Sequence, residues 1–302
     1  MTTTTRPTDQ LARPKWLGPE QWPFTLRVHQ HRNARGEQLN IHYTDEGSGP
    51  ALVFVHAGMW SFIWRDVIKT LSRNFRCLAI DFPGTGLSGG DRNDIGIHTY
   101  PGILTAVLDE CHVEDATFVV HDLGGVVGVL AAARNPARIN GLVAANSFGW
   151  APDRFALQVM LRVMGSRVAT ASLGTLRTIP RLSKTSAGVG AHFDDADRRA
   201  FFGPYRSRAT SRNFHRTMRS ARQATASFER AEQALAGPLG HLPVLTIFGA
   251  KNDPFGFADR WRTLFPTARQ WTVEDGNHFP MNDDPDGFAA HITNWYHAEV
   301  AS

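Results

Sequence analysis

Short apolar runs bounded by turn residues recur along the first part of the chain. Runs rich in β-branched and aromatic residues occur at 24–28, 39–43 and 51–56, each bounded by Gly, Asn or Asp. Such runs are typical of successive β-strands. Residues 1–21 contain three prolines and no sustained periodicity, so we expect them to form a loose N-terminal arm on the surface.

Beyond the third run, strand-like and helix-like segments alternate. Further strands are predicted at 77–81, 116–121, 139–146, 243–249 and 270–273. Helices are predicted at 61–72, 97–111, 124–134, 257–265 and 286–296. This alternation is typical of parallel βαβ units with right-handed crossovers. The sequence therefore predicts an α/β fold with a mostly parallel, eight-stranded, doubly wound sheet flanked by helices.

The alternation stops between residues 150 and 240. This segment is rich in Ala, Arg and Leu and is interrupted by Gly and Pro, a pattern that favours helices over strands. We therefore expect a helical cap at 150–240, inserted into an α/β core made of residues 22–149 and 241–302. A chain of 302 residues is long enough for one such core with its cap.

The composition is that of an ordinary soluble globular protein, with 42% hydrophobic and 20% charged residues. The net charge is +4, but no nucleic-acid module accompanies the arginines, which are concentrated at 198–230, so no nucleic-acid partner is expected. There are two cysteines, no signal-peptide-like segment and no apolar stretch long enough to span a bilayer. These features predict a cytoplasmic protein without a membrane partner and leave its oligomeric state open.

The stretch Val-Val-His-Asp-Leu-Gly-Gly at 119–125 carries the strongest chemical signal. It joins a predicted strand to a predicted helix, and Gly124 is the small residue that a nucleophile elbow requires two positions after its reactive residue. Asp122 occupies the reactive position, so the predicted nucleophile is a carboxylate. An aspartate here could also serve as the N-cap of the helix, but two further motifs favour catalysis.

These two motifs follow later predicted strands. Asp253 lies in Gly-Ala-Lys-Asn-Asp-Pro at 249–254, and His278 lies in Gly-Asn-His-Phe at 276–279. Open α/β sheets place their sites at the carboxyl ends of their strands. The order nucleophile, acid, histidine is that of α/β-hydrolases. Asp122, Asp253 and His278 are therefore the predicted catalytic triad.

The loop after the third strand reads His-Ala-Gly-Met-Trp at 56–60. In such enzymes this loop supplies one N–H of the oxyanion hole, and the residue after the nucleophile supplies the other. We assign these donors to the backbones of Gly58 and Leu123 and interpret His56 as a hydrogen-bonded anchor of the loop. No clustered His, Cys or carboxylate spacing predicts a metal site, and no cofactor is expected.

From about residue 24 to 295 the chain resembles the α/β-hydrolase superfamily, and its His-Asp-x-Gly-Gly elbow resembles those of haloalkane dehalogenases and epoxide hydrolases. The stretches at 64–68 and 75–79 favour the dehalogenase branch. The resemblance implies that Asp122 attacks a saturated carbon and forms an alkyl ester, which a water activated by His278 and oriented by Asp253 hydrolyses. The implied substrate is small and hydrophobic, either halogenated or an epoxide.

The sequence departs from both enzyme types. Haloalkane dehalogenases resemble one another in having a tryptophan after the nucleophile, and often an asparagine in the oxyanion loop, to hold the halide; here these positions are Leu123 and Gly58. Trp60, Trp150 and Tyr205 are candidates for the substrate or leaving-group pocket. Epoxide hydrolases resemble one another in using two cap tyrosines, and the expected cap holds only Tyr205. An epoxide hydrolase, another α/β hydrolase with this triad and a non-hydrolytic binding protein therefore remain alternatives.

Overall fold

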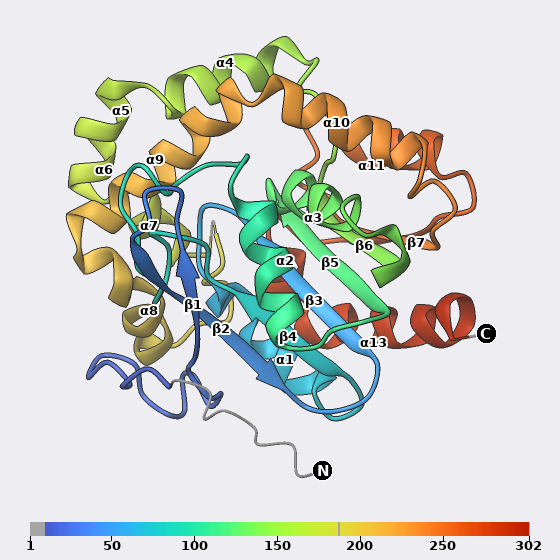
Figure 1. Ribbon diagram of the computed structural model, residues 1–302, viewed down its shortest axis with the longest axis horizontal. Helices are drawn as coiled ribbons and strands as arrows, with labels where there is room; N and C mark the ends of the chain where they lie inside the picture. The colour runs from blue at the N-terminus through green and yellow to red at the C-terminus, as the bar shows by residue number, and fades with distance from the viewer. Residues whose placement is uncertain (1–9, 187, 302) are drawn as a thin grey trace.

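Eight strands form one sheet in the computed structural model, which describes residues 10–186 and 188–301 (Figure 1). The strand order is β1-β2-β4-β3-β5-β6-β7-β8, and only β2 runs antiparallel to its neighbours. The strands are β1 (Arg27–Arg32), β2 (Gln38–Glu46), β3 (Ala51–His56), β4 (Arg76–Ile80), β5 (Ala116–Asp122), β6 (Ile139–Ser147), β7 (Val244–Gly249) and β8 (Arg269–Val273). The predicted mostly parallel, eight-stranded sheet is confirmed.

The first strand begins later than predicted. Phe24 and Leu26 are buried, as an apolar strand would be, but the backbone N–H of Thr25 donates to Glu46 Oε1 and the carbonyl of Leu26 accepts from the N–H of Leu11. The apolar run at 24–28 therefore enters the core before its backbone joins the sheet. Apolar patterning reports burial of side chains, which does not require ladder hydrogen bonds.

Residues 10–21, expected to be a loose arm, pack against the body of the protein. Leu17 is only 2% exposed, and the Arg13 guanidinium donates to the carbonyls of Trp22 and Phe24. The Trp16 ring meets the edge of Trp60 at a centroid distance of 5.9 Å. Apolar side chains among the prolines therefore anchor this part of the arm, and residues 1–9 lie outside the described residues.

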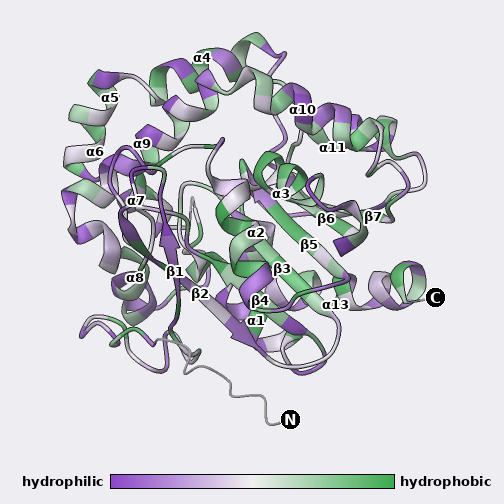
Figure 2. Cartoon of the chain, viewed as in Figure 1, coloured by the Kyte–Doolittle hydropathy of each residue, from purple (hydrophilic) through white to green (hydrophobic). Residues whose placement is uncertain are grey.

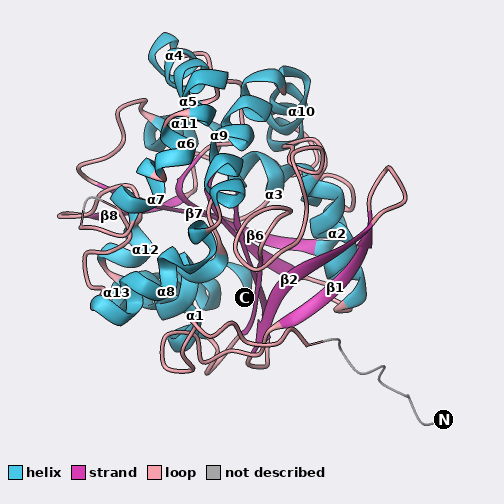
Figure 3. Ribbon diagram, turned by 90° about the vertical axis from the view of Figure 1, so that its left-hand side faces the viewer, coloured by secondary structure: helices cyan, strands magenta, loops and turns pink. Residues whose placement is uncertain are grey.

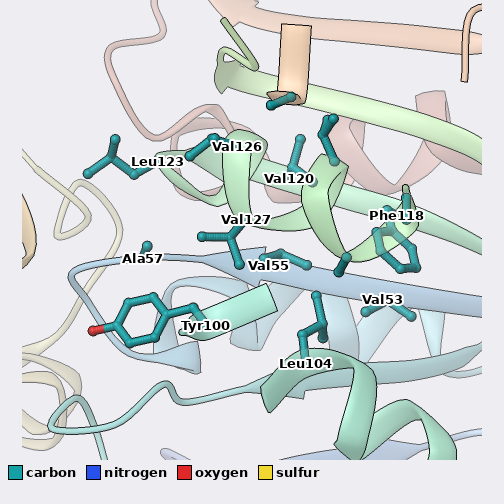
Figure 4. Packing of buried hydrophobic residues seen from close by; sticks show 14 of the residues in the cluster. Val53, Val55, Ala57, Tyr100, Leu104, Phe118, Val120, Leu123, Val126 and Val127 are labelled. Carbon is teal, nitrogen blue, oxygen red and sulfur yellow. The ribbon is translucent and has the colours of Figure 1, made fainter. Parts of the chain in front are cut away.

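Helices cover both faces of the sheet. The side chains of Val53, Val55 and Val120 pack with Leu104 and Val126 on one face (Figure 4). Leu52, Phe54 and Val119 point to the opposite face, as successive strand residues must. The core helices are η1 (Ser61–Trp64), α1 (Arg65–Leu71), α2 (Tyr100–Glu110), α3 (Gly124–Ala132), η2 (Pro136–Arg138), α11 (Phe257–Leu264), α12 (Pro280–Asp283), α13 (Pro285–Trp295) and η4 (Tyr296–Val300).

A helical segment separates β6 from β7 in the chain, and we call residues 150–240 the helical insertion. It contains α4 (Phe155–Met164), α5 (Arg167–Ala171), α6 (Leu173–Leu176), α7 (Thr178–Ser183), α8 (Asp195–Phe202), η3 (Gly203–Arg206), α9 (Arg208–Gln223) and α10 (Thr225–Ala236). Helices α4, α5 and α6 pack on α9, whereas α10 packs on α3 of the core. Figure 3 shows α4, α5, α6 and α9 lying above the sheet. Among the described residues no helix is long and apolar enough to cross a bilayer.

Candidate active site

The turn between β5 and α3 has the geometry of a nucleophile elbow. Asp122 has a φ of 50°, a left-handed conformation that is uncommon for residues other than glycine. A Cβ on Gly124 would lie 2.2 Å from the carbonyl oxygen of Val55 on the neighbouring strand. Only glycine therefore lets α3 approach the sheet this closely, as predicted from the elbow motif, and the sharp turn presents the Asp122 side chain at the strand end.

Asp122 and His278 face each other, with Nε2 of His278 lying 3.6 Å from Oδ2 of Asp122. This spacing is long for a hydrogen bond, but catalytic contacts often tighten when substrate binds. Burial by itself would raise the pKa of Asp122, but His278, His56 and His121 together outweigh burial and lower that pKa to about 2. The carboxylate is therefore ionised at neutral pH, the form in which it can act as a nucleophile.

Three histidines form a hydrogen-bonded chain beside the nucleophile. Nε2 of His121 lies 2.7 Å from the carbonyl oxygen of His278, and Nδ1 of His121 lies 3.0 Å from Nδ1 of His56. Burial lowers the pKa of His121 well below its usual value and that of His56 to about 4, so both rings are neutral at neutral pH. Because a carbonyl only accepts, His121 carries its proton on Nε2, and its Nδ1 accepts from the Nδ1–H of His56. His56 is thus a hydrogen-bonded anchor, as expected.

Asp253 lies at the start of α11. Its Oδ1 accepts the N–H of Phe257 at 2.8 Å, and its Oδ2 accepts the N–H of Ala258 at 2.9 Å. Within the described residues no hydrogen bond joins this carboxylate to His278. Each carboxylate oxygen has a second lone pair, so the orienting contact with His278 stays a prediction.

The loops that carry Asp253 and His278 are tied together at the ends of β6 and β7. The side chain of Asn146 donates from Nδ2 to the carbonyl of Asn252 at 2.6 Å, and its Oδ1 accepts the N–H of Gly249 at 2.9 Å. A Cβ on Gly249 would lie 2.0 Å from the carbonyl oxygen of Asn277. The buried Asn146 amide therefore holds the Asp253 loop to the end of β6, and Gly249 lets the His278 loop approach it closely.

A cavity of about 460 Å³ lies between these loops and the helical insertion. Asp122, Asp253 and His278 all contribute to its lining, together with His56 and Leu123. The remaining lining is mostly apolar and comes from both core and insertion: Met59, Phe148, Leu157, Met160, Leu161, Met164, Ile179, Leu182, Phe214, Met218, Pro254, Phe255, Phe257 and Phe279. The size and apolar lining suit a small hydrophobic molecule.

Trp60, Trp150 and Tyr205 were expected in the leaving-group pocket, but the structure places them elsewhere. None of them is among the described residues that line the cavity. The indole N–H of Trp60 donates to the carbonyl of Phe201 at 3.0 Å, and Tyr205 packs on the same phenylalanine. Trp150 packs edge-on against Trp261. All three candidates are at most 2% exposed, so this expectation is corrected: they are packing residues.

Gly58 has a backbone conformation that suits glycine. Its φ is +114°, where a residue with a side chain is strained. The asparagine common at this position in haloalkane dehalogenases would therefore require a different loop. His56, Met59 and Leu123 line the cavity around this loop, whereas Gly58 lies against Phe214. The assignment of the Gly58 and Leu123 N–H groups to an oxyanion hole stays a prediction.

Besides Asn146, two polar residues that line the cavity were not among the predicted site residues. Ser183, at the end of α7, is 7% exposed and is the one described lining residue of the helical insertion with a hydroxyl, amide or charged side chain. Asn252 also lines the cavity. Neither side chain hydrogen-bonds to another described residue. Asn252 could have been found from its place beside Asp253, whereas a serine among Thr, Ser and Ala residues gives no distinctive sequence signal.

Comparisons with known proteins identify the family and the relatives that this chain matches. Residues 52–291 match the model of the "Alpha/beta hydrolase family". The chain is 27% identical to haloalkane dehalogenase 2 of Mycobacterium tuberculosis over 286 residues, covering 91% of this chain and 96% of the relative. It is 28% identical to the cis-3-alkyl-4-alkyloxetan-2-one decarboxylase of Shewanella oneidensis, covering 84% of each chain.

A solved structure shares the same fold. The haloalkane dehalogenase DbeA from Bradyrhizobium elkani superposes with a TM-score of 0.75 at 20% identity, covering 90% of this chain and 98% of DbeA. The family match covers most of the chain and includes the elbow and the loops that carry Asp253 and His278. The chain therefore belongs to the alpha/beta hydrolase family and is a hydrolase that resembles the haloalkane dehalogenases.

Proposed function

We propose that Asp122 attacks a carbon of a small hydrophobic substrate and forms an alkyl-enzyme ester, as the resemblance to haloalkane dehalogenases implies. A water activated by His278 then attacks the carbonyl carbon of this ester and releases an alcohol. Asp253 orients His278, and the N–H groups of Gly58 and Leu123 stabilise the tetrahedral oxyanion. The observation that carries the proposal is an ionised Asp122 carboxylate, 3.6 Å from a histidine, at the wall of an apolar cavity.

The apolar lining supports the first step. A carboxylate in water is strongly solvated, whereas little of this cavity wall can hydrogen-bond to Asp122. A carboxylate that has lost part of its hydration reacts more readily with carbon. The same wall gives a hydrophobic substrate a place to bind next to the carboxylate.

The two candidate substrates, a haloalkane and a strained ring, differ in the group that Asp122 would displace. Leu123 and Gly58 replace the two side chains that would hold a halide, but Ser183 and Asn252 bring an O–H and an N–H to the cavity. These donors suit an oxygen leaving group, such as the oxygen of an epoxide, which stays attached to the substrate and takes up a proton. The relative from Shewanella oneidensis, named for a four-membered ring substrate, supports this second candidate.

Trapping of the ester distinguishes the two candidates. His278→Phe removes the base for the second step. The ester should therefore accumulate on Asp122 when this variant is incubated with a panel of bromoalkanes and terminal epoxides. By intact mass, a bromoalkane adds only its alkyl group because bromide leaves, whereas an epoxide adds its whole mass. The double variant His278→Phe/Asp122→Asn is the control and should gain no mass.

Two results from the same panel would contradict the proposal. Halide or diol release by the natural chain, with no adduct on His278→Phe from the same compound, would show that hydrolysis proceeds without an ester on Asp122. Peptide mapping that placed the adduct on another carboxylate would contradict the assignment of the nucleophile.

A further inference from the structure

The exposed large hydrophobic side chains of the described residues lie together on the outer helices of the insertion. Phe155 is 80% exposed, Val163 56%, Val168 75% and Leu176 59%. They lie on α4, α5 and α6, which follow one another along the rim of the molecule away from the sheet (Figure 1). Soluble proteins rarely gather exposed apolar residues in this way without an interaction partner.

Helix α4 is apolar on two opposite sides. Leu157 and Leu161 are buried, whereas Phe155, Val159 and Val163 repeat every four residues on the side that faces solvent. Apolar and polar residues alternate along α4 and α5 (Figure 2). A helix that packs on a protein through one side needs no second apolar stripe for folding, so the outer stripe of α4 points to a partner.

The charge of this segment is one-sided. Residues 154–193 contain no Asp or Glu, and they contain six basic residues: Arg154, Arg162, Arg167, Arg177, Arg181 and Lys184. Four of the arginines, at 154, 162, 167 and 181, are exposed. None of these four forms an ion pair with another described residue. The exposed apolar side chains therefore share their segment with four exposed arginines that form no ion pair with another described residue.

We propose that the outer face of α4–α7 docks on a lipid surface that carries anionic headgroups. Apolar side chains that enter the headgroup region, ringed by Arg and Lys that meet lipid phosphates, are the two features of an interfacial helical surface. The expectation that the protein has no membrane partner rested on the lack of a spanning segment, and docking on a surface requires none.

The cavity reaches the same face. Met160 and Leu182 line the cavity. They also belong to the apolar residues of the outer face, where their side chains are 41% and 56% exposed. Part of the cavity wall therefore belongs to the face on which the lipid would lie. A hydrophobic substrate dissolved in the lipid could then enter the cavity without crossing water, a consequence that rests on the proposed function.

A second copy of the chain fits this face less well than lipid. In a symmetric dimer the same surface meets itself, so the arginines of residues 154–193 would face identical arginines. Like charges without counter-charges oppose such a contact, whereas they favour an anionic surface. The structure thus favours the lipid over self-association.

Vesicle binding of the full chain tests the proposal without any need for turnover. We expect the protein to sediment with vesicles of equimolar phosphatidylcholine and phosphatidylglycerol, less at high salt, and not with phosphatidylcholine alone. Arg162→Gln/Arg167→Gln should weaken partitioning roughly 25-fold, because each basic residue near an anionic surface contributes roughly fivefold. Phe155→Ser/Val163→Ser should weaken it by more than about tenfold, because both apolar side chains leave water on docking.

A matched control removes two charges elsewhere. Lys15 and Arg73 are exposed on other parts of the molecule, so Lys15→Gln/Arg73→Gln should retain most of the binding. Circular dichroism and thermal unfolding check that each variant keeps the fold. The proposal is overturned if the natural chain ignores anionic vesicles at low salt, or if the control weakens binding as much as the arginine pair. A dimer in solution that Phe155→Ser/Val163→Ser dissociates would also overturn it, in favour of a second copy.

Discussion

Acidification should destabilise the protein through the buried histidine chain, and His56→Gln should remove a defined part of that effect. Burial lowers the pKa of His56 from 6.5 in the unfolded chain to about 4 in the folded protein. Above pH 6.5 the ring is neutral in both states and contributes no pH dependence. Between pH 6.5 and 4 the unfolded chain binds a proton that the folded protein does not, so the free energy of unfolding falls as the pH falls.

The size of this effect follows from the shift. Each pKa unit corresponds to about 1.4 kcal/mol, so His56 should cost the folded state about 3 kcal/mol between pH 6.5 and 4. His121 acts with the same sign, because burial also lowers its pKa. The lowered pKa of Asp122 acts below pH 3.8 and leaves this window unaffected.

Urea unfolding followed by tryptophan fluorescence measures the effect. At neutral pH His56→Gln should be less stable than the natural chain, because it loses the buried contact with His121. As the pH falls to 4 the difference between the two proteins should shrink by about 3 kcal/mol. A difference that stays constant across this range would show that His56 protonates normally in the folded state, and the neutral histidine chain would then be wrong.

Three substitutions test other parts of the account. Gly124→Ala places a Cβ 2.2 Å from the carbonyl oxygen of Val55 and should cost about 3 kcal/mol of unfolding free energy, whereas Gly89→Ala, whose nearest atom is 3.6 Å away, should cost far less in the same thermal melts. Asn146→Ala loses two hydrogen bonds and should lower the free energy of urea unfolding by about 2 kcal/mol; an unchanged midpoint would show that water replaces them. Ser183→Ala should reduce kcat/KM for epoxides by about 100-fold if its hydroxyl protonates the ring oxygen, and equal losses for epoxides and bromoalkanes would argue against that role.

The central strands of the sheet were predictable because they are buried on both faces. The run at 51–56 matched β3 residue for residue, since it is apolar up to His56 and bounded by turn residues. The start of β1 was not predictable, because Phe24 is buried without pairing in the sheet. The packing of residues 10–21 was also missed, because isolated apolar residues such as Leu17 among prolines show no periodicity.

The candidate site was also predictable only in part. The shared location of Asp122, Asp253 and His278 was predictable because each lies at the end of a strand or in the loop that follows one, and the strand ends of a parallel sheet meet at one edge. The positions of Trp60 and Ser183 were not, because they depend on how the helical insertion lies on the core. The indole N–H of Trp60 finds a backbone carbonyl 141 residues away in sequence, a pairing that no local pattern encodes.

The central claim is that the carboxylate of Asp122 forms an ester, and a single turnover in ¹⁸O-labelled water tests it most directly. With enzyme in excess over a substrate that the panel identifies, the alcohol should leave with an unlabelled oxygen from Asp122, because water attacks the carbonyl carbon of the ester. The peptide that contains Asp122 should gain the label. An alcohol that carries ¹⁸O from the first turnover, with Asp122 unlabelled, would contradict the account, because water would then have attacked the substrate itself.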